Sequence, residues 1–597
     1  MSSNPAKALL CLIVVPFLST TDCGAAVRST TSPNIIVFLS DDQGWGDLSL
    51  NGNENLSTPN IDQLAKEGTQ FDRFFVCPVC SPTRAEFLTG RYHPRGGVYG
   101  VSTGGERLNL DEVTIADTLK AAGYATAAFG KWHNGMQYPY HPLGRGFQEF
   151  YGFCSGHWGQ YFTPMLDHNG EIVTGEGFCI DDFTNHAIRF IEENQDEPFF
   201  VYLPYNTPHS PMQVPDSWWN RFADKEITSR HRDPDKEDVV FTRAALAMCE
   251  NIDWNVGRVL QTLDRLQLTN DTIVLYFCDN GPNSFRWNGG MKGRKGSTDE
   301  GGVRSPLIIR WPGKIAAGRK AEPIAAAIDL LPTIADLASV PLISTKPLDG
   351  VSLKPLLAPE AIPNEWPDRT LISHWGKRVA ARNQRFRLDD AGHLFDMSID
   401  PGQYSNLAEQ HPEITEELKD AVRRYRNEVM PGYDKDSRPF LIAHPDFAIT
   451  QLPARDAVTV GGMTRSSRHP NCSYFSNWCS TEDAIHWKVD VVEEGEFEVG
   501  IYYTCAAPDV GATIQLRFRD AMLEGIVSDP VESALIGGSD DRVERGEGYV
   551  KNFGRMTLGR MHLPKGTGTL TLSATDIPGS QVMDFRLLTL RRISAEP

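Results

Sequence analysis

The sequence predicts an α/β protein: a sheet flanked by helices, then a small antiparallel C-terminal subdomain, then an appended β-sandwich. Three observations predict this order. Apolar runs alternate with helical patterns up to about residue 340, short strand-like segments precede one long helix up to about residue 440, and short alternating segments fill the remainder. The length of 597 residues exceeds what one hydrophobic core supports, so we expect two or three domains.

Apolar runs typical of strands buried on both faces occur in the first part, at residues 34–40, 198–203, 272–278 and 306–310. Helical patterns lie between them, at residues 114–122, 181–193 and 242–266. This alternation indicates a parallel sheet covered on both faces, in which ligands bind beyond the carboxyl ends of the strands. Two polar pairs, Asp41–Asp42 and Asp279–Asn280, directly follow such runs. We therefore expect both pairs at one edge of the sheet.

The rest of the chain has a different character. Segments 369–373, 377–381 and 384–388 precede an amphipathic helix from Pro412 to about Met430, which predicts a small antiparallel sheet with a covering helix over residues 341–440. Gly and Pro near residues 431–439 indicate a linker. Residues 445–597 predict an antiparallel β-sandwich accessory domain. Its aromatic side chains are expected mostly in the core, with a sugar-stacking face as the alternative: Tyr474, Phe475, Trp478, Trp487, Tyr502 and Tyr503.

The first residues have the pattern of an export signal. Lys7 precedes an apolar run over residues 8–18, and small residues at 24–26 offer a cleavage site. The run is too short to span a bilayer, and no later stretch reaches the required length. We therefore expect a signal peptide over residues 1–26, no transmembrane segment, and a secreted or periplasmic protein.

The net charge and the cysteine content limit the ligands and the disulfides that we expect. The net charge of −19 argues against nucleic-acid binding, because phosphate-binding surfaces are basic. A local cluster of Lys and Arg in a pocket can still bind a small anion. Of the 11 cysteines, Cys154 with Cys179 and Cys472 with Cys479 are the candidate local disulfides in an oxidising compartment, although the sequence leaves the connectivity open.

The segment 78–91 (PVCSPTRAEFLTGR) carries the chemistry. Its Ser81-Pro82-Thr83 triplet predicts a helix start, because Pro suits the first turn. Cys80 would then lie at the helix N-terminus, where free amides and the helix dipole favour anions, and Arg84 would lie one turn further on the same face. Cys77 and Cys80 also form a C-x-x-C pair, for which a disulfide, a redox pair or half of a zinc site are alternatives.

The pattern Cys80-x-Pro82-x-Arg84, followed by the FLTGR of residues 87–91, resembles the signature of type I sulfatases, formylglycine-dependent members of the alkaline phosphatase superfamily. The resemblance extends over residues 33–440. It implies an alkaline-phosphatase-like sheet and a catalytic domain over residues 27–340. It also implies that a formylglycine-generating maturation enzyme converts Cys80 to 3-oxoalanine (Cα-formylglycine), whose hydrate is the nucleophile.

Two further motifs resemble the metal motifs of that family, SDDQGWGD at residues 40–47 and DNG at residues 279–281. The resemblance implies that Asp41, Asp42, Asp279, Asn280 and the modified Cys80 hold one metal ion, and that Asp279 takes the proton of the hydrate. Oxygen ligands of this kind favour Ca²⁺, with Mg²⁺ as the alternative.

The remaining site residues lie in motifs that match the family in order: GKWH at residues 130–133, TPHSP at 207–211, and KGS through EGGVR at 295–304. By this resemblance Arg84 and Lys131 hold charge on the metal side, and Lys295 binds the sulfate oxygens. His209, with Lys295, protonates the departing alcohol. His133 removes a proton from the free hydroxyl of the nucleophile so that sulfate is expelled.

The function these motifs imply is hydrolysis of sulfate monoesters. An appended sandwich on an exported enzyme favours a sulfated saccharide substrate. Two alternatives stay open at this point: a formylglycine-dependent phosphonate or phosphodiester hydrolase, and an inactive secreted glycan-binding protein.

Overall fold

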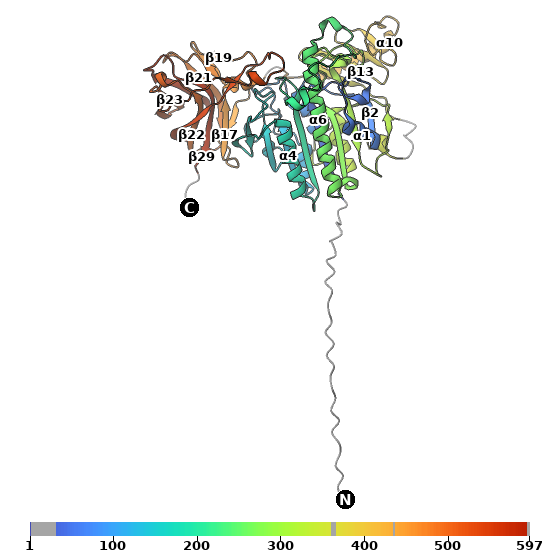
Figure 1. Ribbon diagram of the computed structural model, residues 1–597, viewed down its shortest axis with the longest axis horizontal. Coiled ribbons are helices and arrows are strands. Elements are labelled where there is room, and N and C mark those ends of the chain that lie inside the picture. The colour runs from blue at the N-terminus through green and yellow to red at the C-terminus, as the bar shows by residue number, and fades with distance from the viewer. Residues whose placement is uncertain (2–31, 360–365, 434–435, 594–597) are drawn as a thin grey trace. The chain divides into compact units, whose positions relative to one another are not determined.

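The computed structural model describes Met1 and residues 32–359, 366–433 and 436–593 (Figure 1). Apart from Met1, the predicted signal peptide lies outside the described residues. The described residues from Ser32 onward form one compact unit. Among the described residues, no helix combines the length and the apolar character that a membrane span requires.

The first part of the chain forms an 11-stranded mixed sheet in which the predicted apolar runs are central strands. Its order is β10 (Arg319–Ala321), β2 (Thr69–Phe75), β9 (Arg304–Arg310), β8 (Thr272–Cys278), β1 (Asn34–Asp41), β7 (Phe199–Pro208), β3 (Ala125–Lys131), β4 (Glu149–Phe153), β5 (Met165–His168) and β6 (Glu171–Thr174), with β11 (Ala325–Ala326) paired to β2. The neighbours β8, β1, β7, β3 and β4 are parallel.

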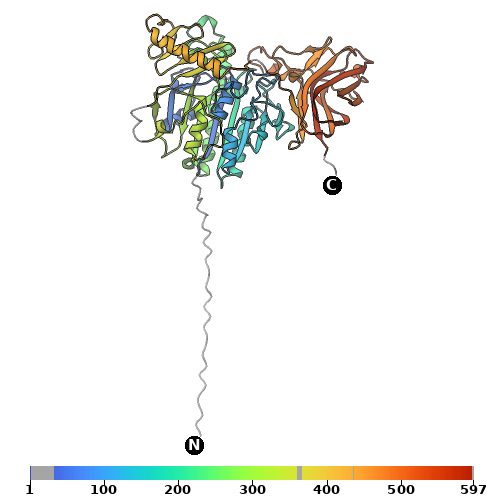
Figure 2. The same cartoon turned by 180° about the vertical axis from the view of Figure 1, so that it is seen from behind.

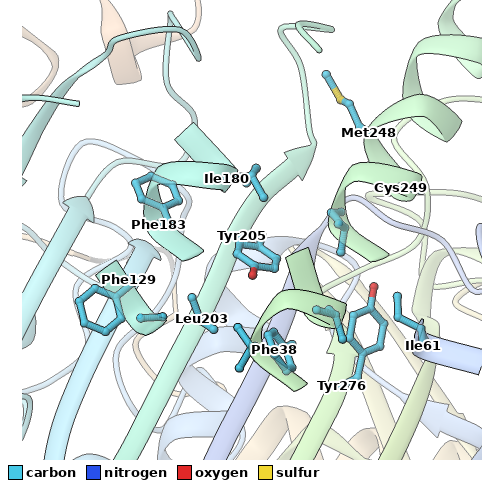
Figure 3. Close-up of a cluster of buried hydrophobic side chains, with 14 of the residues drawn as sticks. Phe38, Ile61, Phe129, Ile180, Phe183, Leu203, Tyr205, Met248, Cys249 and Tyr276 are labelled. Carbon is cyan, nitrogen blue, oxygen red and sulfur yellow. The ribbon is translucent and has the colours of Figure 1, made fainter. Parts of the chain in front are cut away.

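Helices cover both faces of this sheet, as expected for strands that are apolar throughout. One face packs against α1 (Pro59–Glu67), α4 (Cys179–Glu193) and α6 (Val239–Arg265), which Figures 1 and 3 show. The other face packs against α2 (Cys80–Thr89), α3 (Ile115–Ala121) and α8 (Leu330–Leu337). Successive side chains of β1 point to opposite faces of the sheet, so Phe38 packs into the first layer and Val37 into the second. The predicted α/β class is confirmed.

One strand corrects the expectation of a purely parallel sheet. The run at residues 306–310 forms part of β9, which is antiparallel to both β8 and β2. The chain between β8 and β9 contains only the short helix α7 (Glu300–Val303), so it turns back at the edge where β8 ends instead of crossing over. The loop at residues 279–303 consequently stays at that edge.

The small antiparallel sheet is also present, in the order β12 (Leu371–Trp375), β13 (Arg378–Arg382), β14 (Phe386–Leu388) and β15 (Leu394–Asp396). It packs against the amphipathic helix α10 (Pro412–Glu428), visible in Figure 2. Leu418 of α10 is fully buried against this sheet.

The C-terminal residues form two further sheets that enclose one apolar core. The first runs β16 (Phe440–Ile442), β21 (Ala484–Val491), β28 (Gly566–Asp576), β23 (Thr513–Phe518) and β24 (Ala521–Ile526), with β18 (Val458–Val460) on β21. The second runs β19 (Thr464–Arg465), β20 (Phe475–Ser476), β29 (Asp584–Arg592), β22 (Gly495–Thr504) and β27 (Gly554–Leu563), with β17 (Ile449–Pro453) on β29. Trp478 and Trp487 are completely buried in this core, whereas Tyr502 is only half-buried.

The candidate disulfides are wrong. All nine cysteines in the described residues are free thiols. Cys154 packs into the core layer that contains Val37, and Cys179 into the layer that contains Phe38, so the sheet separates them. Cys472 is buried with its thiol hydrogen-bonded to the His157 carbonyl, while Cys479 is exposed.

Candidate active site

The candidate site lies at the edge where four neighbouring strands end. Asp41 is the last residue of β1, Lys131 the last of β3, Asp279 follows β8, and His209 follows β7. Because β8, β1, β7 and β3 are parallel neighbours, these four side chains meet at one edge, which the sequence had predicted for Asp41 and Asp279.

Helix α2 brings Cys80 to the same edge. Cys80 is its first residue, and the preceding Val79 provides no side-chain cap, so the first amides of the helix remain available to an anion. The helix ends at Thr89 and is capped by Gly90 with φ 68°, a left-handed conformation that glycine adopts without strain. Cys80 itself is only 4% exposed. Its sulfur and the nearest carboxylate oxygens of Asp41 and Asp279 all lie within 4.8 Å of one another.

Several buried side-chain oxygens at this edge accept no hydrogen bond within the described part of the chain. Asp41 Oδ1, Asp42 Oδ2 and Asn280 Oδ1 have no hydrogen bond among the described residues. The backbone of Asp42 is left-handed, with φ 65°, and its amide donates to Asp279 Oδ1 at 3.2 Å. Such a conformation in a non-glycine residue is costly, and such strain clusters at functional sites. Buried, unpartnered oxygens from carboxylate and amide groups fit a hard cation such as Ca²⁺.

Three cationic side chains pair with the carboxylates at this edge. Lys131 Nζ lies 2.5 Å from Asp41 Oδ2, Lys295 Nζ lies 2.6 Å from Asp42 Oδ1, and Arg84 donates from Nη2 to Asp279 Oδ2 at 2.8 Å. Arg84 also donates to the Lys131 carbonyl at 2.6 Å, so it is held between two strand ends.

The buried charges shift the pKa values of their neighbours. Burial raises the pKa of Asp279 to about 6, and the Asp41 carboxylate adds to the rise against the opposing effect of Arg84. Burial also disfavours the charge on Asp42, but Lys295, His209 and Lys131 outweigh it and hold the pKa of Asp42 below its ordinary value. Burial raises the pKa of the Cys80 thiol, although Lys131 and Lys295 oppose the rise. The unmodified Cys80 is therefore a neutral thiol at neutral pH.

The two histidines contact backbone carbonyls through different ring nitrogens. His133 Nε2 lies 2.8 Å from the Val101 carbonyl oxygen, so it carries the proton, and the buried Nδ1 has no partner among the described residues. His209 Nδ1 lies 2.6 Å from the Ser210 carbonyl oxygen, and its Nε2 lies 3.7 Å from Asp42 Oδ2. Burial, followed by Lys295, lowers the pKa of His209 to about 4. Burial, followed by Lys131, lowers the pKa of His133 as well.

A second buried group lies beside α2: Glu86 of this helix with Cys77 and His93 from the segments before and after it, whose side-chain ligand atoms lie within 4.8 Å of one another. Glu86 accepts from the His93 amide at 3.2 Å. Burial raises the pKa of Glu86 to about 8 despite its hydrogen bonds to Cys77 and His93. Glu86 is therefore largely protonated in the folded protein at neutral pH.

A pH dependence of stability follows. Between pH 4.5 and 8 the folded state keeps a proton on Glu86 that the unfolded state releases, so the wild-type protein loses stability as pH rises, by up to about 1.4 kcal/mol per pH unit. Glu86→Gln removes the titrating group and with it this pH-dependent loss of stability. We expect the melting temperature of the variant, relative to wild type, to increase from pH 5 to pH 8, with Glu193→Gln, a change at an exposed glutamate, as the control. A constant difference would contradict the buried, protonated state.

The site also has neighbours that the sequence did not indicate. The ring of His157 stacks on that of His209 at 6.0 Å, and Asn471 Nδ2 lies 3.1 Å from His157 Nδ1. Ser210 donates a hydrogen bond to Glu547. Asn471 and Glu547 belong to the C-terminal part, outside the sulfatase resemblance, and His157 lies in none of the motifs recognised. A contact between distant segments leaves no periodic pattern that would have revealed them.

The fold and these side chains are typical of an enzyme of the α/β class that hydrolyses esters of small oxyanions: carboxylates, cations and a helix N-terminus converge on one residue. Residues 33–340 match the family model Sulfatase, and residues 295–428 match N-sulphoglucosamine sulphohydrolase, C-terminal. The chain is 31% identical to mouse N-acetylgalactosamine-6-sulfatase over 60% of its own length and 71% of the relative's. It is 30% identical to human arylsulfatase A, over 77% of its own length and 97% of the length of arylsulfatase A.

A solved structure, Ps i-CgsB in complex with k-i-k-neocarrahexaose, is similar at a TM-score of 0.60 and 28% identity, with 68% of this chain and 95% of that chain covered. The chain belongs to the sulfatase family and is a sulfuric ester hydrolase.

Proposed function

We propose that the enzyme hydrolyses sulfate monoesters of a saccharide, with a formylglycine derived from Cys80 as the nucleophile and one bound Ca²⁺. The observation that carries this proposal is the position of Cys80 at the start of α2, within 4.8 Å of the Asp41 and Asp279 carboxylates. A thiol nucleophile reacts as its thiolate, and burial keeps the unmodified Cys80 in its neutral thiol form. The unmodified cysteine would therefore be a poor nucleophile, which supports its conversion to formylglycine. The hydrated aldehyde supplies one hydroxyl for attack and a second for the later release of sulfate.

The residues that would hold the cation are Asp41, Asp42, Asp279, Asn280 and the modified residue 80. The oxygens of Asp41, Asp42 and Asn280 that lack a hydrogen bond among the described residues support this assignment. When bound, the cation would polarise the sulfate and favour deprotonation of the hydrate. Mg²⁺ is the alternative ion for the same oxygens.

The cations would position the sulfate group. Lys295, whose side chain is 22% exposed, contacts Asp42 and would bind the sulfate oxygens from the open side of the site. Lys131 and Arg84 are completely buried and would hold the nucleophile and the carboxylates in place. Positioning and charge stabilisation of this kind are the main catalytic contributions in transfer of related oxyanion groups.

The histidines would move two different protons. His209 Nε2 would protonate the leaving alcohol together with Lys295. Because burial and Lys295 lower the pKa of His209, the negative charge of the sulfate group would be needed to favour its protonated form. His133 Nδ1 would accept the proton of the free hydroxyl, since its Nε2 proton is already donated to Val101. General acid and base help is typically worth about 10²–10⁴-fold.

The similarity to N-acetylgalactosamine-6-sulfatase and to the enzyme solved with a neocarrahexaose supports a saccharide substrate. The test is sulfate release from defined sulfated saccharides, with protein co-expressed with a formylglycine-generating enzyme. Turnover of aryl sulfates alone would contradict the saccharide assignment. Faster turnover of an aryl phosphodiester than of an aryl sulfate would favour the phosphodiesterase alternative. For the proposed export, sequencing the N-terminus of secreted protein is the check.

The ligand assignment predicts linked losses of metal and activity. Asp42→Asn and Asp279→Asn each remove one carboxylate charge from a hard-cation site, so calcium affinity should fall by at least about tenfold and turnover should fall with it. Calcium content after dialysis, measured by mass spectrometry, checks this. The control is Asp62→Asn, whose carboxylate accepts hydrogen bonds from Ser49 and Thr58. Stoichiometric calcium and normal turnover in both site variants would refute the assignment.

A further inference from the structure

A cavity of 410 Å³ lies where residues 158–174 meet strands of the C-terminal sheets. Its lining includes Trp158, Met165, Tyr502, Phe553, Lys551 and Arg586. The volume falls in the range of small-ligand pockets, and the mixture of aromatic surface with a few polar groups is typical of them. None of the residues assigned above to catalysis or metal binding lines this cavity.

The charges of the lining are all positive. Lys551 and Arg586 line the cavity and no carboxylate does, in a chain with 77 acidic and 58 basic residues. The Lys551 charge is already compensated, because Nζ donates to Asp584 at 2.5 Å. Arg586 is therefore the cation that a ligand would meet without a competing carboxylate.

Arg586 is 4% exposed and lacks an ion-pair partner within the described part of the chain. Its Nη1 donates to the Ser473 carbonyl at 2.9 Å. Burial, and the nearby Arg455, lower the pKa of Arg586. A buried guanidinium is normally paired, because removing its charge from water is costly. An anion with two adjacent oxygens would satisfy the remaining donors, since guanidinium binds such groups in a bidentate manner.

Aromatic rings lie beside this cation. Arg586 Cζ lies 5.7 Å from the Trp158 ring centroid, and Trp158 is stacked on Phe153 at 5.1 Å. Trp158 and Tyr502 are both half-buried, so part of each ring faces open space. An aromatic ring beside a guanidinium suits a sugar that carries an anionic group, because the apolar face of the sugar covers the ring while the anion meets the arginine.

The cavity adjoins the candidate active site through one loop. Trp158 follows His157, whose ring stacks on His209. Cys472, which also lines the cavity, donates to the His157 carbonyl at 3.2 Å. The His157–Trp158 segment therefore contacts the candidate active site on one side and lines the cavity on the other.

We propose that this cavity is a second, non-catalytic subsite that binds a sulfate group carried by another residue of the saccharide, with Arg586 on the sulfate and Trp158 against the sugar ring. The inference rests on the proposed saccharide sulfatase function. It assigns a binding role to the C-terminal domain and predicts a preference for chains with more than one sulfate group.

Binding is measured by calorimetry in a Cys80→Ala background, so turnover does not interfere. The probes are a chondroitin 6-sulfate hexasaccharide, its desulfated form, and inorganic sulfate. Arg586→Gln should weaken hexasaccharide binding by about tenfold or more, the usual effect of losing a hydrogen-bonded charge. With Cys80 intact, Arg586→Gln should leave aryl sulfate turnover unchanged. Val550→Trp, which fills the cavity and keeps Arg586, should weaken binding as well and guards against misfolding of the first variant.

The matched control is Arg519→Gln, an arginine of the same domain that donates to the Lys565 and Thr567 carbonyls. Equal hexasaccharide affinity in the control and in both cavity variants would overturn the subsite, as would undetectable binding of the hexasaccharide. An arginine effect confined to inorganic sulfate would also overturn it, since the site would then hold free sulfate. If Arg586→Gln loses binding while the wild-type enzyme releases no sulfate from the hexasaccharide, the subsite stands and the saccharide assignment of the catalytic site fails.

Discussion

Cys80→Ala is expected to lower sulfatase turnover by at least about 10⁴-fold, because the variant cannot form the proposed nucleophile and the cations alone provide only residual catalysis. The fold should survive, since the change removes one sulfur atom from a helix start. Circular dichroism and aryl sulfate kinetics on the same preparation separate the two effects. Cys77→Ala is the matched control: it removes a buried cysteine three residues earlier, on the Glu86 side of α2, and should retain turnover.

The chemical state of residue 80 is the second measurement on this prediction. Peptide mass spectrometry of active wild-type protein should show the mass of an aldehyde in place of the thiol. Cys80→Ser should be inactive in a host that converts only cysteine. Full activity of Cys80→Ala, or full activity of wild-type protein with an unmodified thiol, would refute the proposed nucleophile.

The sequence predicted much of this site because the relevant signals are local. Apolar runs identify β1 and β8, and the polar pairs after them had to meet once both strands were parallel neighbours. Pro82 indicated the start of α2, which the structure places at Cys80. The α/β class and the family are confirmed, while the roles of individual side chains remain proposals.

What the sequence did not predict depends on long-range packing. An apolar run carries no direction, so the antiparallel orientation of β9 could not be inferred from residues 306–310. Nearness along the chain suggested two disulfides, although the sheet separates Cys154 from Cys179. The contact of Glu547 with Ser210 joins segments 337 residues apart and has no local signature.

Replacing the two candidate histidines should change the turnover of sugar sulfates and aryl sulfates in different ways. His209→Ala should lower turnover of a sugar sulfate by about 10²–10⁴-fold and that of nitrophenyl sulfate by less than about tenfold. A sugar alkoxide is strongly basic and needs a proton as its S–O bond breaks, whereas nitrophenolate leaves unaided. His133→Ala should slow both substrates to a similar extent, because the step it assists follows departure of the alcohol.

Rapid-quench kinetics distinguish the two roles. His133→Ala should release about one equivalent of nitrophenol per active site in a burst and then turn over slowly, because attack is intact and sulfate release is impaired. His209→Ala should show no such burst with the sugar sulfate, since its slow step comes first. His393→Ala, a change at an exposed histidine, serves as the control and should behave like wild type. A burst in His209→Ala but not in His133→Ala would mean that the two roles are reversed, with Nε2 of His209 acting on the hydroxyl and Nδ1 of His133 on the alcohol.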